Sequence, residues 1–97
     1  MIEYRYPEEK IVAQYFAELL QDTKATEIIQ RGTVTSAEEA THLSQFFWAM
    51  IEKSTQAVEI PCEGSAEYWT EKLYNTLGGY LENAGYGQQW EEEIDKA

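Results

Sequence analysis

Apolar residues recur at helical spacing in three separate stretches of this 97-residue chain, and this periodicity constrains the fold more than any other feature. The first stretch follows Pro7 and fades near Asp22; its apolar members are Ile11, Val12, Tyr15, Phe16, Leu19 and Leu20. Pro7 is followed by two glutamates, which is typical of a helix start, because proline suits the first position and acids suit the positive end of the helix dipole. We therefore expect a first helix from Pro7 to the region of Asp22.

The second stretch opens with a serine that is followed three residues later by a glutamate, Ser36 and Glu39. This is a capping-box pattern, in which the serine side chain accepts from the Glu39 amide and the glutamate reaches back to the serine amide. The apolar stripe behind it comprises Leu43, Phe46, Phe47, Met50 and Ile51, and Trp48 lies off its centre. The sequence therefore predicts a second helix that ends near Ser54.

The third stretch opens at Ser65, and Asn83–Gly85 has the pattern of its C-terminal cap. Its apolar side comprises Trp69, Leu73, Leu77, Tyr80, Leu81 and Ala84. Two glycines, Gly78 and Gly79, lie inside this helix and disfavour it by about 1 kcal/mol each relative to alanine. Either the helix breaks at this pair or another backbone packs close to it. After the cap, a short tail helix over 88–95 is expected to dock through Trp90 and Ile94.

The connecting segments are ambiguous. Residues 1–6, 23–35 and 56–64 each contain a short apolar pattern that suits a strand, an irregular link or a helical turn. The leading expectation is an all-α fold, a small three-helix domain with a short C-terminal helical tail. The alternative is an α+β fold with a small two- or three-stranded sheet. In either case the length predicts one domain over residues 1–97.

The charge of the chain points to the kind of partner. Eighteen acidic residues stand against seven basic ones, which gives a formal net charge of −11, and segment 54–97 holds half of the acids but only two of the bases. Such a protein repels phosphate backbones and is attracted to basic surfaces, and many large basic surfaces belong to proteins that bind nucleic acid. The aromatic content of 13% argues against disorder at this charge. We expect a basic nucleic-acid-binding protein as partner and no direct binding of nucleic acid.

Catalytic and metal motifs are weak. The chain has one histidine, His42, and one cysteine, Cys62, too few for a typical zinc site and without the setting of a nucleophile. The run Glu91–Glu93 could hold magnesium, but a solvated terminal segment explains it better. We predict no enzyme activity, no catalytic residue, no metal and no cofactor.

The start of the chain resembles no secretory signal, and no apolar run approaches the length of a membrane span. The expected location is the cytoplasm of a bacterial or phage-infected cell, without membrane association.

A row of carboxylates is the sharpest candidate for binding. Glu63, Glu67 and Glu71 are spaced four apart, and Glu67, Glu71 and Glu82 fall within about 60° of one another on a helix. Four helical residues rise about 6 Å, close to the spacing of adjacent phosphates. Like charges at this spacing oppose helix formation by a few tenths of a kcal/mol, so a binding role would explain them, although a solvated acidic face also would.

Aromatic residues outside the apolar stripes add to this surface, because Tyr and Trp are enriched at binding hot spots. The candidate partner-binding residues are Glu63, Glu67, Glu71, Glu82, Trp48, Tyr68, Tyr74, Trp90, Glu91, Glu92 and Glu93.

These features favour a non-enzymatic acidic protein that binds and inhibits a nucleic-acid-binding protein, partly by mimicking phosphates. In size and charge alone the chain resembles phage and mobile-element inhibitors of host defence, such as anti-CRISPR and anti-restriction proteins. One alternative is a helical homo-oligomeric regulatory or immunity-type protein, for instance a homodimer with a seam at Trp48. The other is a small-ligand binder that gathers the basic residues Arg5, Lys10, Lys24 and Arg31.

Overall fold

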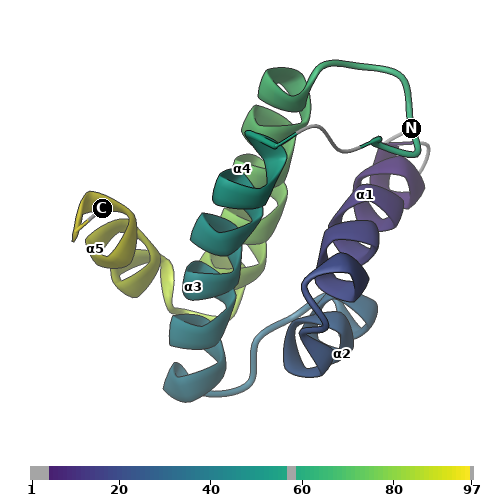
Figure 1. The fold of residues 1–97 in the computed structure, drawn as a ribbon. Helices are drawn as coiled ribbons and strands as arrows, with labels where there is room; N and C mark the ends of the chain where they lie inside the picture. The colour runs from purple at the N-terminus through teal and green to yellow at the C-terminus, as the bar shows by residue number, and fades with distance from the viewer. Residues whose placement is uncertain (1–4, 57–58, 97) are drawn as a thin grey trace.

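The computed structural model describes residues 5–56 and 59–96, and over these residues the chain forms five helices (Figure 1). The helices are α1 (Arg5–Leu19), α2 (Thr23–Arg31), α3 (Ala37–Ser54), α4 (Ala66–Asn83) and α5 (Gly87–Lys96). The predicted all-α class is confirmed. The sheet alternative is not supported, since no strand forms within the described ranges. The apolar patterns over 1–4 and 57–58 lie outside those ranges.

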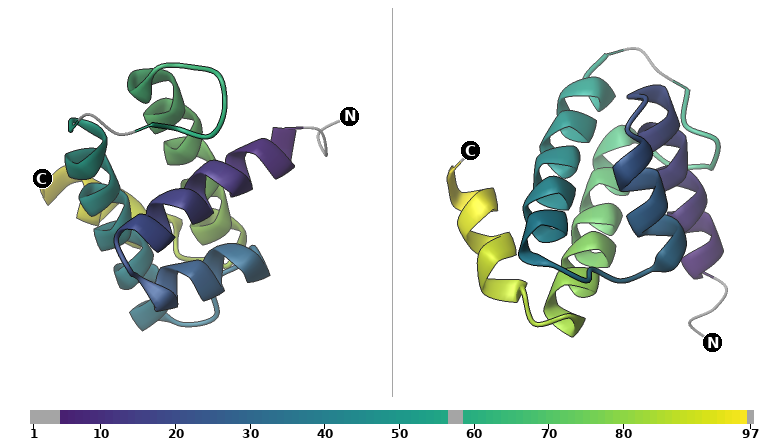
Figure 2. Two further views of the ribbon diagram at one scale, coloured as in Figure 1. Left: turned by 45° about the vertical axis from the view of Figure 1, so that its right-hand side comes forward. Right: turned by 90° about the horizontal axis from the view of Figure 1, so that it is seen from below.

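The helices surround a central pair. α3 and α4 lie side by side, with α1 and α2 on one side of them and α5 on the other (Figure 2). The shared core draws on every helix, and its buried apolar members are Val12, Ala13, Phe16, Ala17, Ala25, Ile28, Ile29, Val34, Ala40, Leu43, Phe46, Phe47, Met50, Trp69, Leu73, Leu77, Leu81 and Trp90. A polar link adds to this packing, because the Thr76 hydroxyl of α4 donates to Glu9 of α1.

Helix α2 was not expected as a full element. Its N-cap is Asp22, whose Oδ1 accepts from the Ala25 amide at 3.0 Å. Ala25, Ile28 and Ile29 recur three and four residues apart and are completely buried. The adjacent isoleucines suit a strand as well as a helix, so the local pattern could not decide. In the structure, the Asp22 cap and the burial of one face stabilise the helix.

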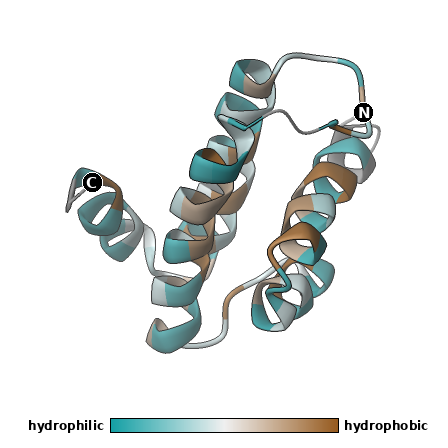
Figure 3. Cartoon of the chain, viewed as in Figure 1, coloured by the Kyte–Doolittle hydropathy of each residue, from teal (hydrophilic) through white to brown (hydrophobic). Residues whose placement is uncertain are grey.

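Helix α1 begins two residues before Pro7, which keeps this proline in the first turn, where its missing N–H breaks no helical hydrogen bond. Val12 and Phe16 are buried as predicted, whereas two other members of the predicted apolar face are not. Ile11 and Leu19 remain 49% and 38% exposed, whereas Ala13 and Ala17 are buried. Small side chains such as these permit close approach of a neighbouring helix, and part of the predicted apolar face remains exposed. Hydrophobic bands run along α1 in Figure 3, while α5 is almost wholly hydrophilic apart from one band near its C-terminal end.

The glycine pair does not break α4, which continues through Gly78 and Gly79 to Asn83. What approaches the pair is a side chain and not a backbone. A Cβ placed on Gly78 would lie 2.7 Å from the Trp90 Nε1 atom, whereas a Cβ on Gly79 would meet nothing within 4 Å. Gly78 therefore provides the space into which the indole of α5 packs. The predicted docking of the tail helix through Trp90 and the predicted cap at Gly85 (φ 89°) both agree with the structure.

The capping box at α3 forms only in part. The Ser36 hydroxyl accepts from the Glu39 amide at 3.2 Å, as predicted. The Glu39 carboxylate, however, reaches one residue further back, where Oε1 accepts from the Thr35 amide at 3.0 Å and from Nη2 of Arg31 at 2.6 Å. These contacts tie the end of α2 to the start of α3. They also lower the pKa of Glu39 from 4.5 to about 2, chiefly through the hydrogen bond from Arg31 and next through the Thr35 amide.

The two central glycines offer a matched pair of substitutions. Gly79→Ala should raise the free energy of unfolding by about 1 kcal/mol, because alanine favours the helix and meets no neighbour. Gly78→Ala has the same helical advantage but displaces the Trp90 indole, so a net loss of about 1–2 kcal/mol is expected. Urea denaturation measures both values. Equal gains for the two variants would contradict the described packing of Trp90.

The Glu39 contacts predict a pH dependence. Because the pKa of Glu39 is lower in the folded chain, its stabilisation is complete above pH 4.5 and is lost as the pH falls toward 2. Glu39→Gln should lower the free energy of unfolding by about 1 kcal/mol at pH 7, with a difference from the wild type that shrinks over that window. Denaturation at stepped pH measures it. The control is Glu38→Gln, which removes a solvent-exposed ion pair with Lys24 and should change stability by less than about 0.5 kcal/mol.

Candidate partner-binding site

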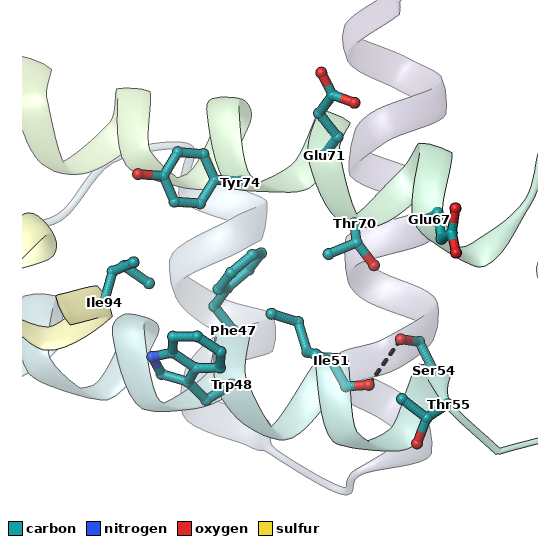
Figure 4. A pocket seen from close by; sticks show the side chains of 10 residues that line it. All are labelled: Phe47, Trp48, Ile51, Ser54, Thr55, Glu67, Thr70, Glu71, Tyr74 and Ile94. Carbon is teal, nitrogen blue, oxygen red and sulfur yellow. Dashed lines mark hydrogen bonds between the residues drawn. The ribbon is translucent and has the colours of Figure 1, made fainter. Parts of the chain in front are cut away.

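A groove of about 500 Å³ opens between the C-terminal half of α3, the N-terminal half of α4 and the end of α5 (Figure 4). Its lining residues are Phe47, Trp48, Ile51, Ser54, Thr55, Glu67, Thr70, Glu71, Tyr74 and Ile94. Four of the predicted site residues, Trp48, Glu67, Glu71 and Tyr74, are therefore brought together from two helices that are adjacent in sequence but separated by a long connection.

The floor of the groove is built on an aromatic cluster of Phe47, Trp48, Tyr74 and Trp90. The Phe47 ring lies 5.7 Å from the ring of Tyr74 and 5.3 Å from that of Trp90, both in edge-to-face arrangement. Trp48 lies edge-on to Phe47 at 6.0 Å, and its indole N–H donates to the Glu93 carbonyl of α5 at 3.4 Å. Such aromatic pairs favour a fixed geometry, so the groove has a preformed apolar surface.

The α4 side of the groove is acidic. Glu67 and Glu71 lie one helical turn apart, are exposed, and stand at the edge of the groove with the apolar side chains between them and α5 (Figure 4). Within the described parts of the chain, neither carboxylate makes a hydrogen bond or an ion pair. Glu67 gains from the positive end of α4, in whose first turn it lies, whereas Glu71 lies beyond that turn.

Other predicted residues lie outside the groove. Tyr68 is 46% exposed, packs edge-on against Trp69 and has the Lys72 ammonium 5.5 Å from its ring centre. Glu63 lies in the connection before α4, where its carbonyl accepts from the Trp69 indole N–H at 3.0 Å. These contacts hold the start of α4 and leave both side chains apart from the aromatic cluster.

The predicted row of carboxylates on α4 is interrupted. Gly78 projects within about 40° of Glu67, Glu71 and Glu82 on the helix, and Trp90 covers it. Glu82 lies on the other side of this contact, next to the start of α5, since a Cβ on Gly87 would lie 2.9 Å from the Glu82 Cγ. The three side chains therefore share a face of α4 without forming one continuous surface.

The predicted residues of α5 are also divided. Trp90 is only 2% exposed, so the structure assigns it to the core, and its prediction as a partner-facing residue is corrected. Glu91 and Glu92 are exposed and Glu93 is half-buried, and none of the three lines the groove. The residue of α5 that lines the groove is Ile94, which was not among the predicted partner-binding residues.

Of the two residues considered for chemistry, His42 has a structural partner. His42 Nε2 lies 2.7 Å from Asp22 Oδ1 near the start of α3, whereas Cys62 is half-buried in the connection beyond the other end of that helix. In the parts of the chain described, no group of three or more metal-ligating side chains comes together. None of the described helices combines the length and apolar character needed to cross a bilayer.

The basic residues proposed for a phosphorylated ligand are likewise engaged elsewhere. Lys10 donates to the Gln30 carbonyl at 2.9 Å, Lys24 pairs with Glu38 at 3.0 Å, and Arg31 pairs with Glu39. The side chain of Arg5 lies outside the described set.

In comparisons with known proteins, no family model, no curated protein and no solved structure matches this chain.

Sequence reasoning missed the groove itself. The sequence places Phe47 and Ile51 in an apolar stripe and Ile94 in the docking of the tail helix, and it gives no role to Ser54, Thr55 or Thr70. A groove depends on how three helices pack, which the sequence pattern does not show. One signal was available: a glycine pair inside a helix marks where another element approaches, and the Trp90 ring that packs there contacts two residues of the groove, Phe47 and Tyr74.

The acidic edge predicts a gain in stability on charge reversal. Glu71→Lys removes a like-charge pair with Glu67 and creates a Glu–Lys pair four residues apart in the favourable order. The free energy of unfolding should rise by about 0.5 kcal/mol at low salt, and the gain should shrink in 1 M salt because exposed charges are screened. A loss of stability instead would show that Glu71 supports the fold.

Proposed function

We propose that this protein is a non-enzymatic acidic interaction protein that binds a basic surface on a nucleic-acid-binding protein and blocks it. The observation that supports the proposal is the groove, in which two exposed carboxylates without described partners, Glu67 and Glu71, border a preformed aromatic floor with Trp48 and Tyr74. Charge complementarity steers association, and buried aromatic contacts hold a complex.

The molecule as a whole is acidic, like the edge of the groove, with a net charge of −11. A basic partner would be attracted from a distance, and a nucleic acid would be repelled. Inhibition follows if the bound surface is the one that the partner uses for nucleic acid. Phosphate mimicry then rests on Glu67 and Glu71, about 6 Å apart along α4, and not on a row that extends to Glu82. An inhibitor of a host-defence nuclease, of the anti-CRISPR or anti-restriction type, would fit this role.

A self-assembling regulatory protein is the second candidate. It is favoured by Ile11 and Leu19, two large apolar side chains of α1 that remain exposed. Association through such a seam would be insensitive to salt, whereas binding at the acidic groove would weaken as salt rises.

The proposal predicts the outcome of a charge reversal in the groove. Tagged wild-type protein should retain a basic nucleic-acid-binding protein from nuclease-treated bacterial lysate and release it as salt is raised. Glu67→Lys combined with Glu71→Lys should abolish retention, because the edge of the groove becomes repulsive. A nucleic-acid oligonucleotide that the partner binds should compete with the wild-type protein for it.

The matched control reverses two exposed glutamates on α1 and α2, Glu18→Lys with Glu27→Lys, which changes the net charge by the same amount. This variant should keep most of the retention. If both double variants lose retention equally, the effect depends on net charge and not on the groove. If no nucleic-acid-binding protein is retained and eluted by salt, the proposed function is contradicted.

A further inference from the structure

We infer that the occupant of the groove is an amphipathic helix of the partner that bears lysine or arginine side chains one turn apart. This inference rests on the proposed function and deepens it, because it names the chemistry of the segment that the acidic groove recognises. It follows from three observations: how α5 packs on α3 and α4, how long the groove is, and where its charges lie.

Helix α5 shows what the α3–α4 surface accepts. It lies beside α3 from Ala37 to Trp48, since Gln89 donates to the Ala37 carbonyl and the Trp48 indole donates to the Glu93 carbonyl. Its Trp90 ring contacts Phe47 and Tyr74. A helix with an aromatic anchor is therefore already bound to this pair of helices within the chain.

The groove continues from the point where α5 ends. Ile94 belongs both to the apolar side of α5 and to the lining of the groove. From there the groove extends to Ile51 on α3, to Thr55 just after α3 and to Glu67 on α4. The distance along α4 from Glu67 to Tyr74 is seven residues, or about 10 Å. This length fits two turns of a helix, which would present apolar anchors at positions i, i+3 or i+4, and i+7.

The charges at the groove select a basic helix. Glu67 and Glu71 are about 6 Å apart along one edge, the same spacing as lysines or arginines at i and i+4 on a partner helix. The last turn of α3 also ends at the groove, where the Ser54 and Thr55 hydroxyls bond to the carbonyls of Ile51 and Glu52. This is the negative end of the α3 dipole. The nearest lysines of the two helices, Lys53 and Lys72, are not among the lining residues.

The same charges disfavour other occupants. A second copy of the chain would bring another −11 to an acidic edge. A neutral apolar ligand would use the floor and leave the two carboxylates without partners. A basic amphipathic helix uses both the floor and the edge.

The test is an NMR titration of the isotope-labelled full chain with a synthetic probe. The probe is a 14-residue helical peptide with lysines four residues apart beside a stripe of leucines. Two control peptides replace the lysines with glutamates or scramble the same composition. Shift changes should concentrate at the amides of Phe47, Ile51, Thr70 and Tyr74 and at the Trp48 indole. The glutamate peptide should bind at least about tenfold more weakly.

A matched variant pair sharpens the result. Glu67→Gln with Glu71→Gln should weaken binding of the lysine peptide about tenfold at low salt, whereas Glu18→Gln with Glu27→Gln should leave it within about twofold. Three outcomes would overturn the inference: shift changes spread over the whole chain, binding of the scrambled peptide as tight as that of the lysine peptide, or equal effects of the two double variants. Shifts of the groove residues on simple dilution of the protein would overturn it in favour of a second copy.

The two proposals fail in different ways. If the wild-type protein captures a basic partner through Glu67 and Glu71 but the lysine peptide avoids the groove, the proposed function stands and the helical occupant does not. If the peptide occupies the groove but no nucleic-acid-binding protein is captured from lysate, the recognition chemistry stands and the proposed function does not.

Discussion

The packing of the Trp90 indole against Gly78 is the contact on which the C-terminal half of this protein depends. It fixes α5 to α4, and through the rings of Phe47 and Tyr74 it also fixes α5 to α3. Only a residue without a Cβ leaves room for the indole at that point of α4. The same contact divides the acidic face of α4, and the Trp90 ring packs against Phe47 and Tyr74, which line the groove. A helix-disfavouring glycine is thus retained in mid-helix because tertiary packing outweighs helix propensity.

The charges of the chain are used differently in its two halves. In the N-terminal half, bases and acids meet each other: Arg31 pairs with Glu39, and Lys24 pairs with Glu38. Asp22 has two roles, since one carboxylate oxygen both caps α2 and contacts His42 of α3. At the groove, Glu67 and Glu71 make no such contact with other described residues. Two carboxylates that do not support the fold through such contacts therefore lie beside an aromatic floor.

Much of the fold could be predicted because the signals are local. Ser36 and Ser65 each cap a helix by accepting from an amide three residues on, and Gly85 adopts the left-handed conformation that ends α4. Helix α2 was missed because Ile28 and Ile29 fit two periodicities. On α1, Val12 and Phe16 are buried as predicted, but Ala13 and Ala17 are buried as well and Ile11 remains exposed. Only the residue types of the site could be predicted, and not their arrangement. Its carboxylates and aromatics are visible in the sequence, but their meeting depends on helix packing, which no local pattern encodes.

The lengths of the connections have a consequence for folding. Three residues join α1 to α2 and three join α4 to α5, whereas eleven residues separate α3 from α4. Closing a short turn between neighbouring helices restricts little chain, so each hairpin can assemble early and at small entropic loss. The longest connection must close before α3 and α4 can form their common surface. Helical domains with mostly local contacts fold in about milliseconds or less, and we expect the same of this chain. The groove would then be completed in the last step, when α3 and α4 come together.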